Sequence, residues 1–161
     1  MIEVSVAELE EAVASLPAQS PRRKQLQERQ FQEEQKQLKL ALLTEAQQLA
    51  SAGKLLVRSA TEQNATHVLG CLRRSAMKAR GISVASQKLV NSGGCTLFQA
   101  QSLGAKVREV LRALERTVQA VKEALGKPLS DPAMKRLMLQ STSLAATLTQ
   151  LIQCVREHVL Y

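Results

Sequence analysis

Aromatic residues are almost missing from this chain, whose 161 residues include two Phe, one Tyr and no Trp. Glycine and proline are also scarce, with seven and four copies. The apolar residues are mainly Leu, Ala and Val, which is a composition typical of an all-helical protein. Proteins that hold single-stranded nucleic acid stack its bases on aromatic side chains, so we do not expect a nucleic-acid partner.

Cysteine is sparse, and Cys71, Cys95 and Cys154 lie far apart without C-x-x-C spacing. This pattern predicts neither a disulfide framework nor a zinc site, and it fits a reducing compartment. The chain also lacks a run of 18 apolar residues and a basic N-terminal stretch followed by an apolar core. We therefore expect no transmembrane helix and no signal peptide, and a cytoplasmic location.

Residue types that commonly act in catalysis are also few in this sequence. His67 and His158 are the two histidines, and neither has the spacing of a metal-binding motif. Cys71 follows His67 by four residues, but no acid is placed to orient such a pair, and no glycine-rich phosphate loop occurs. We expect a non-enzymatic protein without a metal or cofactor.

Charge is plentiful and uneven, with a net value of +8. Residues 1–20 hold four acids and no base, whereas residues 73–116 hold nine bases and two acids, a net of +7. A basic block of this kind is either a solvated helix face or a surface for F-actin or anionic lipid. The bases that would form this surface are Arg73, Arg74, Lys78, Arg80, Lys88, Arg108, Arg112 and Arg116.

The N-terminal part is predicted to stand apart from the rest. Glu3 to Leu16 has the pattern of a short acidic helix ended by Pro17, so residues 1–21 are expected to be this helix and a proline-containing linker. Residues 22–37 are rich in Gln and weakly apolar, which suits either a projecting helix start or a linker.

Four long segments with a period near 3.6 residues follow. Ser20-Pro21, Asn64 and Asp131-Pro132 are the helix-start signals, and Gly93-Gly94 and Gly126 with Pro128 are the stop signals. Short turns between long helices favour antiparallel neighbours. Residues 22–161 are therefore predicted to form an all-α, antiparallel up-down four-helix bundle, or a five-helix bundle if the short N-terminal helix joins it.

The last helix is unusual because no charged residue occurs between Gln140 and Cys154. Its outer positions are mostly Ser, Thr and Gln, which form no ion pairs and are mediocre helix formers, so packing must hold it. Its apolar stripe comprises Leu137, Ser141, Leu144, Ala145, Leu148, Leu151, Ile152 and Val155.

The helical segments resemble those of talin-rod and vinculin/α-catenin-type bundles. The resemblance covers about residues 38–160 and is carried by stretches such as LLTEAQQLASAGKLLVRSATE (42–62) and GISVASQKLVNSG (81–93). It implies a cytoskeletal or adhesion scaffold in the cytoplasm, whose partners are proteins.

A sharper likeness concerns the helices of that family that bind the vinculin head, with the pattern L-x-x-A-A-x-x-V-A-x-x-V-x-x-L-I-x-x-A. Residues 137–155 fit it, with Gln140 and Ser141 as departures that are small or uncharged. A second, weaker stripe departs at Glu45 and Gly53, and its matching residues are Leu42, Ala46, Leu49, Ala50, Leu56, Val57 and Ala60. The two remaining helices place Arg80 or Glu115 where the pattern needs a small residue. The resemblance implies a hidden partner-binding helix at 137–155, and protein partners that are a vinculin-like head or amphipathic helices.

Two other functions stay open at this point. One is direct binding of F-actin or acidic lipid through the basic residues between 73 and 116. The other is a helical regulatory domain of a signalling protein, for example one acting on a small GTPase.

Overall fold

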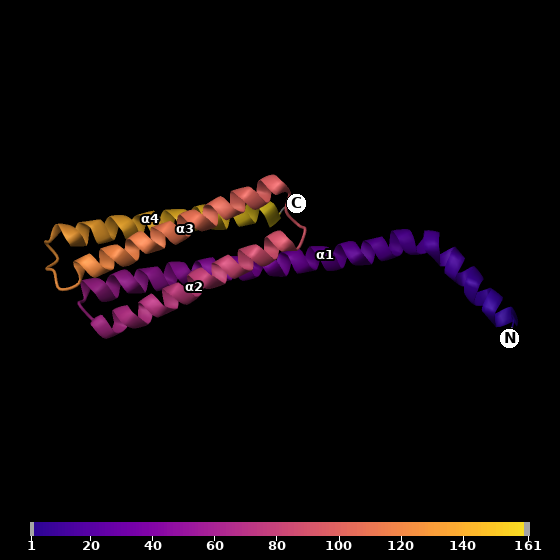
Figure 1. Ribbon diagram of the computed structural model, residues 1–161, viewed down its shortest axis with the longest axis horizontal. Coiled ribbons are helices and arrows are strands. Elements are labelled where there is room, and N and C mark those ends of the chain that lie inside the picture. Colours follow the sequence, from indigo (N-terminus) through magenta and orange to yellow (C-terminus); the bar gives the residue numbers. More distant parts are fainter. Residues whose placement is uncertain (1, 160–161) are drawn as a thin grey trace. The chain divides into compact units, whose positions relative to one another are not determined.

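The protein is all-α over the residues that its structure describes. A computed structural model describes the backbone of residues 2–159 and the side chains of residues 22–157. It contains four helices and no strand in that range: α1 (Ile2–Thr61), α2 (Ala65–Asn91), α3 (Leu97–Ala124) and α4 (Pro132–Val159), as Figure 1 shows. The chain divides into two compact units, Met1–Lys36 and Gln37–Tyr161. The all-helical prediction is confirmed.

The first unit consists of the N-terminal part of α1. The helix is continuous from Ile2, so the predicted end at Pro17, the predicted helix start at Ser20-Pro21 and the separate fifth helix were wrong. A proline in a helix interior removes one backbone hydrogen bond and crowds the preceding turn, but it does not always end the helix, and α1 continues through Pro17. Residues 22–34 are helical and exposed at every position, so the Gln-rich segment is helical. The side chains of the acidic stretch, residues 3–16, lie outside the described side chains.

The second unit is the bundle, and its core contains two clusters. One joins the middle of α1 to the C-terminal half of α2, the N-terminal half of α3 and the C-terminal half of α4, with Leu49, Ile82, Val110 and Leu148 among its members. The other joins the end of α1 to the start of α2, the end of α3 and the start of α4, with Leu56, Val68, Val121 and Leu137. This pairing of starts with ends shows antiparallel, up-down neighbours.

Local chemistry sets the helix boundaries. The Asn64 side chain accepts a hydrogen bond from the His67 N–H (3.2 Å), and the Asp131 carboxylate accepts one from the Ala133 N–H (2.9 Å), so these predicted N-terminal caps are confirmed. Thr96 forms a reciprocal capping box with Gln99 at the start of α3, which was not predicted. Gly126 follows α3 with φ +81°, a conformation that favours glycine.

One side chain connects the two turns at the same end of the bundle. Gln63, in the α1–α2 turn, accepts a hydrogen bond from the Gly126 N–H (2.7 Å) and donates one to the Lys127 carbonyl (2.9 Å). These two bonds satisfy backbone groups of the turn that follows α3. The turns before α2 and before α4 are thus held together.

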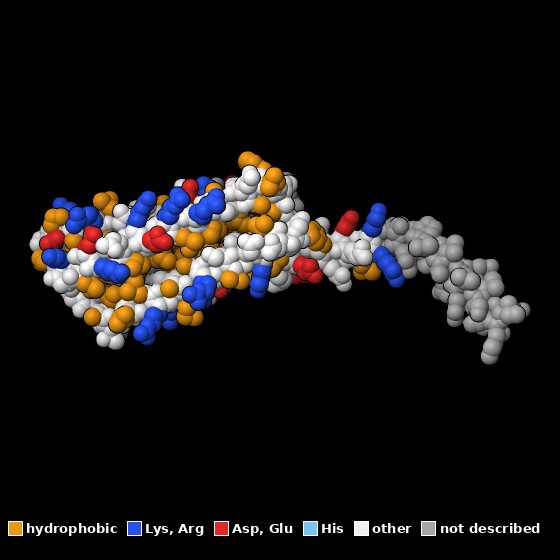
Figure 2. Space-filling view, in the orientation of Figure 1, with side chains coloured by type: hydrophobic (Ala, Val, Ile, Leu, Met, Phe, Trp, Pro, Cys, Tyr) orange, Lys and Arg blue, Asp and Glu red, His pale blue; other side chains and the backbone are white. Residues whose placement is uncertain are grey.

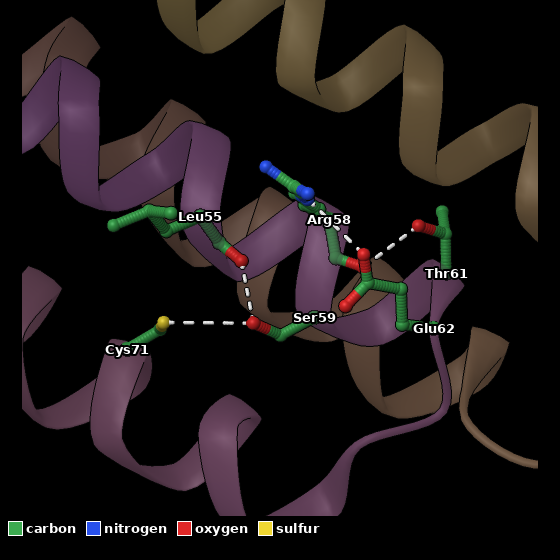
Figure 3. Close-up of polar contacts among 6 residues, drawn as sticks. All are labelled: Leu55, Arg58, Ser59, Thr61, Glu62 and Cys71. Atoms are coloured by element: carbon green, nitrogen blue, oxygen red, sulfur yellow. Dashed lines mark hydrogen bonds and ion pairs between the residues drawn. The ribbon is translucent and has the colours of Figure 1, made fainter.

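The end of α1 is shown in Figure 3. The Ser59 hydroxyl donates to the Leu55 carbonyl (2.7 Å) and lies 3.8 Å from the Cys71 sulfur of α2. On the exposed side of this turn, Arg58 forms an ion pair with Glu62 (3.1 Å). Small polar residues such as Ser59 therefore occupy buried positions between α1 and α2.

Candidate functional site

The candidate site is the inward face of α4, which supplies one wall of the core. Leu137, Leu144, Leu148, Leu151 and Val155 are almost completely buried. They recur at steps of seven, four, three and four residues, which places them on one side of the helix. Ser141 and Ile152 are half-buried at the edge of this face. Seven of the eight stripe residues predicted from the sequence therefore lie in or beside the core.

The buried face of α4 differs from the predicted stripe at its edges. Ala145 is exposed, and so is the neighbouring Met138, so this edge of the predicted stripe is not covered by another helix. Met134 and Cys154, which were not part of the predicted stripe, are buried. Helical spacing identifies a stripe but leaves its exact width to the angle at which neighbouring helices pack.

The outward face of α4 satisfies its hydroxyl groups within the helix itself. Thr142, Thr147 and Thr149 donate to the carbonyls of residues three or four positions earlier, at 2.8–3.0 Å. Such bonds give α4 no attachment to the rest of the bundle. The polar side of the helix therefore contributes little to keeping it in place.

Few polar contacts join α4 to the other helices. The described ion pair is Arg136–Glu123, at 4.0 Å between exposed side chains, a type that contributes about 0–1 kcal/mol. Within the core, the buried Thr117 hydroxyl donates to the Gln140 carbonyl (3.2 Å) and to its own helix at Ala113 (2.8 Å). Among the described side chains, apolar packing is thus the main attachment of α4.

Gly53 of α1 leaves space that the Leu144 side chain of α4 occupies. A Cβ atom at position 53 would lie 3.2 Å from Leu144 Cδ2, which is closer than ordinary van der Waals contact. In the sequence pattern Gly53 is a departure from the second stripe, but in the fold the Leu144 side chain occupies the space it leaves. The rest of the second stripe is also committed to the core: Ala50 is half-buried, and Leu42, Ala46, Leu49, Leu56, Val57 and Ala60 are buried.

Glu45, the other departure of the second stripe, faces α2. A Cβ at Gly81 would overlap the Glu45 carboxylate, so the glycine leaves room for that side chain to pass. The Glu45 carboxylate lies 3.7 Å from the Lys78 ammonium, with both side chains about one quarter exposed. A charged side chain thus occupies the position where the vinculin-binding pattern has a small residue.

The predicted basic residues are distributed over two helices. Lys78 is partly buried in its pair with Glu45, and the other seven are exposed. Arg73, Arg74, Arg80 and Lys88 belong to α2, and Arg108, Arg112 and Arg116 belong to α3. Figure 2 shows several Lys and Arg side chains on the face where α2 and α3 lie, with hydrophobic side chains between the two helices. The predicted basic residues are therefore shared between α2 and α3.

An apolar hollow of about 560 Å³ lies beside the first turns of α4. It is lined from α4 by Met134, Lys135, Met138, Leu139 and Thr142, and by Thr61 and Leu129. Leu139 and Met138 are more than half exposed here. The hollow was not predicted, because its two sides come from the end of α1 and the loop before α4, which only the tertiary structure brings together.

The two cysteines near the other end of α4, Cys154, which is buried, and Cys95, which is half-buried, are not activated nucleophiles. Burial raises the pKa of the Cys154 thiol, although Ser102, 4.0 Å from its sulfur, opposes the change. Burial also raises the pKa of Cys95, and the nearby Lys39 opposes that shift. Burial in turn lowers the pKa of Lys39. A raised thiol pKa reduces the thiolate fraction at neutral pH, so neither thiol is activated for nucleophilic attack.

No other chemical site competes with α4 among the described residues. His67 is exposed, and the side chain of His158 lies outside the described part of the chain. In that part, no three His, Cys, Asp or Glu side chains are grouped to hold a metal ion, and no helix is long and apolar enough to cross a membrane. Comparisons of the chain with family models, curated proteins and solved structures found no match.

Proposed function

We propose that the protein is a non-enzymatic scaffold bundle of the cytoskeletal or adhesion type, and that α4 is a hidden helix that binds a partner protein when the bundle opens. The partner is a helix-receiving groove like that of the vinculin head. The observation that carries this proposal is the double use of one surface: five residues that match the binding pattern, Leu137, Leu144, Leu148, Leu151 and Val155, are those that α4 buries in the core. Such a face is available only after α4 leaves its neighbours.

Because few polar contacts hold α4, the free energy needed to release it is expected to be only a part of the domain's total stability. Proteins of this size have a total stability of about 5–15 kcal/mol, and separate elements open at lower cost than the whole fold. The core also contains a defect, since the buried Ser75 hydroxyl has no hydrogen-bond partner among the described groups. An unpaired buried hydroxyl costs about 1–3 kcal/mol, which lowers the stability that opposes opening.

The apolar hollow supplies a place where a partner can begin. It exposes Met138 and Leu139 next to Met134, which belongs to the buried core. A partner groove that first binds this end of α4 can then release the rest of the helix from the bundle, turn by turn, up to its C-terminus. In this scheme the free energy of opening, rather than the affinity of the exposed helix, regulates binding.

The test compares the intact chain with an isolated peptide of residues 134–158, both titrated against the vinculin head. The peptide should bind with micromolar affinity or better, and the intact chain more weakly, because it must open first. In a Gly53→Leu chain the new side chain fills the space that Leu144 occupies, so α4 should be held less firmly. This chain should bind the vinculin head more tightly than the wild-type chain.

Two controls sharpen this comparison. A peptide with Leu148→Ala should lose affinity, whereas a peptide with Gln153→Ala should not, because Gln153 is exposed on the outer face of α4. No detectable binding of the wild-type peptide at about 10 μM, a level at which micromolar helix ligands register, would refute the proposal.

A further inference from the structure

The outward face of α2 carries an unusual stripe in which apolar and basic residues alternate. Its members are Leu69, Arg73, Met77, Arg80, Val84 and Lys88, separated by steps of four, four, three, four and four residues. These steps keep all six on one side of a helix. The apolar members are strongly exposed, at 54% for Leu69, 69% for Met77 and 49% for Val84.

This stripe faces away from the bundle. Ile82 and Leu89 of the same helix are fully buried, and Ile82 is two residues from both Arg80 and Val84, about half a turn around the helix. In Figure 2, blue and orange side chains lie along the lower edge of the bundle, where Figure 1 places α2. The stripe is therefore accessible while the bundle is closed.

The charges on α2 have one sign. The helix contains five Lys or Arg residues and no Asp or Glu over Ala65–Asn91. Its described ion pair joins Lys78 to Glu45 of α1. Within the described part of the chain, no ion pair involves Arg73, Arg80 or Lys88, so their charges are available to an outside anion.

We propose that the closed bundle binds the surface of an anionic lipid bilayer through this stripe of α2. The bases would contact anionic headgroups, and Leu69, Met77 and Val84 would enter the boundary between headgroups and acyl chains, as apolar faces of interfacial helices do. A bilayer fits better than a protein groove because the stripe is a convex ridge that alternates charge and apolar side chains over its whole length. A flat, fluid, anionic surface satisfies both kinds of side chain at once.

This inference goes beyond the proposed function and is independent of it. Partner binding by α4 needs the bundle to open, whereas the α2 stripe is already exposed. A Gly53→Leu chain, which should bind the vinculin head more tightly, should bind vesicles as the wild type does. The two proposals can therefore fail separately.

The main experiment is co-sedimentation of the full chain with phosphatidylcholine vesicles, with and without phosphatidylserine. Binding should require phosphatidylserine and should fall with salt, since the screening length decreases from about 10 Å at 0.1 M to about 3 Å at 1 M. Each base near such a surface raises the affinity roughly fivefold, so Arg73→Glu with Arg80→Glu should weaken binding by about 25-fold or more.

The matched control is Arg112→Glu with Arg116→Glu, which changes the net charge by the same amount. Arg116 is seven residues before Glu123, which pairs with Arg136 of α4, so these two bases lie on the edge of α3 turned toward α4. The Arg112→Glu, Arg116→Glu variant should weaken vesicle binding by less than about threefold. Equal loss in both pairs would overturn the α2 assignment in favour of a net-charge effect.

Insertion of the apolar side chains has its own reporter, because the chain contains no Trp. The fluorescence of a Met77→Trp variant should shift to shorter wavelength when phosphatidylserine vesicles are added. A Leu139→Trp variant, exposed on α4, should show no shift. A Met77→Ser, Val84→Ser variant should keep the salt dependence but bind several-fold more weakly.

Three results would overturn the proposal. The first is the absence of binding to phosphatidylserine vesicles at low salt by wild-type protein whose helical circular dichroism is intact. The second is vesicle binding by the Met77→Trp variant without a shift in its tryptophan fluorescence. The third is co-sedimentation with F-actin that depends on Arg73 and Arg80 while vesicles remain unbound, which would assign the stripe to an acidic protein surface.

Discussion

Gly53 of α1 and Leu144 of α4 are in direct apposition, because the missing side chain of Gly53 makes the space that Leu144 Cδ2 occupies. A glycine within a helix costs about 1 kcal/mol relative to alanine. At this position that cost accompanies a close approach between α1 and α4. The contact joins the apolar stripes of α1 and α4, and it offers a direct way to alter how firmly α4 is held.

Filling this space should destabilise the bundle. Gly53→Leu is expected to lower the free energy of unfolding by about 1–3 kcal/mol through overpacking, despite its better helix propensity. Gly70→Ala should instead raise it by about 1 kcal/mol, since a Cβ at Gly70 meets no atom within 4 Å. Urea unfolding followed by circular dichroism measures both. Stabilisation by Gly53→Leu would show that Leu144 moves aside without cost.

Leu148 should be essential to the core of the bundle. Leu148→Ala is expected to cost about 2–5 kcal/mol, because Leu148 is 1% exposed and its truncation leaves a cavity. Leu139→Ala, in the same helix at an exposed position, should change stability by less than about 0.5 kcal/mol. The comparison is made by thermal unfolding, and equal effects of the two substitutions would contradict the placement of the α4 core face.

Removing the Ser75 hydroxyl should stabilise the protein. Ser75→Ala is expected to raise the free energy of unfolding by about 1–2 kcal/mol, because this buried oxygen has no hydrogen-bond partner among the described groups. Ser86→Ala is the matched control, since the Ser86 hydroxyl donates to the Ser83 carbonyl at 2.9 Å. Both changes gain the same helix propensity, so their difference isolates the hydroxyl. A lower stability of Ser75→Ala than of Ser86→Ala would mean that another group pairs with Ser75.

Burial of Cys95 and Cys154 should make stability fall at alkaline pH. Burial raises both pKa values in the folded state above the ordinary thiol pKa of 9.0. The folded chain then holds more protons than the unfolded chain, so this contribution is complete below pH 9.0 and is lost as pH rises through the folded pKa. Alkylation by iodoacetamide in a Cys71→Ser background should show a higher pH midpoint for native than for denatured protein. Coinciding midpoints would contradict the prediction.

Sequence alone predicted the helices of the bundle because their signals are local. Asn64 and Asp131 were recognised as caps, and Gly126 as a stop, since each acts on backbone groups a few residues away. Pro17 was misread because a proline has no single outcome: it weakens a helix without always ending it. The Thr96 capping box is also a local signal, because Thr96 and Gln99 have the Thr-x-x-Gln spacing of such a box.

The candidate site could be predicted only in part. The period of α4 identified Leu137, Leu144, Leu148, Leu151 and Val155, because a regular apolar stripe must be buried somewhere. Sequence could not say that Ala145 would be exposed and Cys154 buried, since that depends on the angle at which neighbouring helices cross. Nor could it give Gly53 a role, because the atom that occupies its space comes from a residue far along the chain, in the last helix.

The alternation of apolar and basic residues on α2 can be seen in the sequence, but only the fold shows whether this face of the helix is buried or exposed. A stripe containing Leu69, Met77 and Val84 could have been a second buried face of α2. The structure buries Ile82 and Leu89 instead, since each helix of a four-helix bundle turns one face to its neighbours and the other to solvent. Sequence thus determined which residues share a face, through the fixed geometry of the helix. Tertiary structure decided which faces are covered, because burial depends on contacts between residues far apart in the chain.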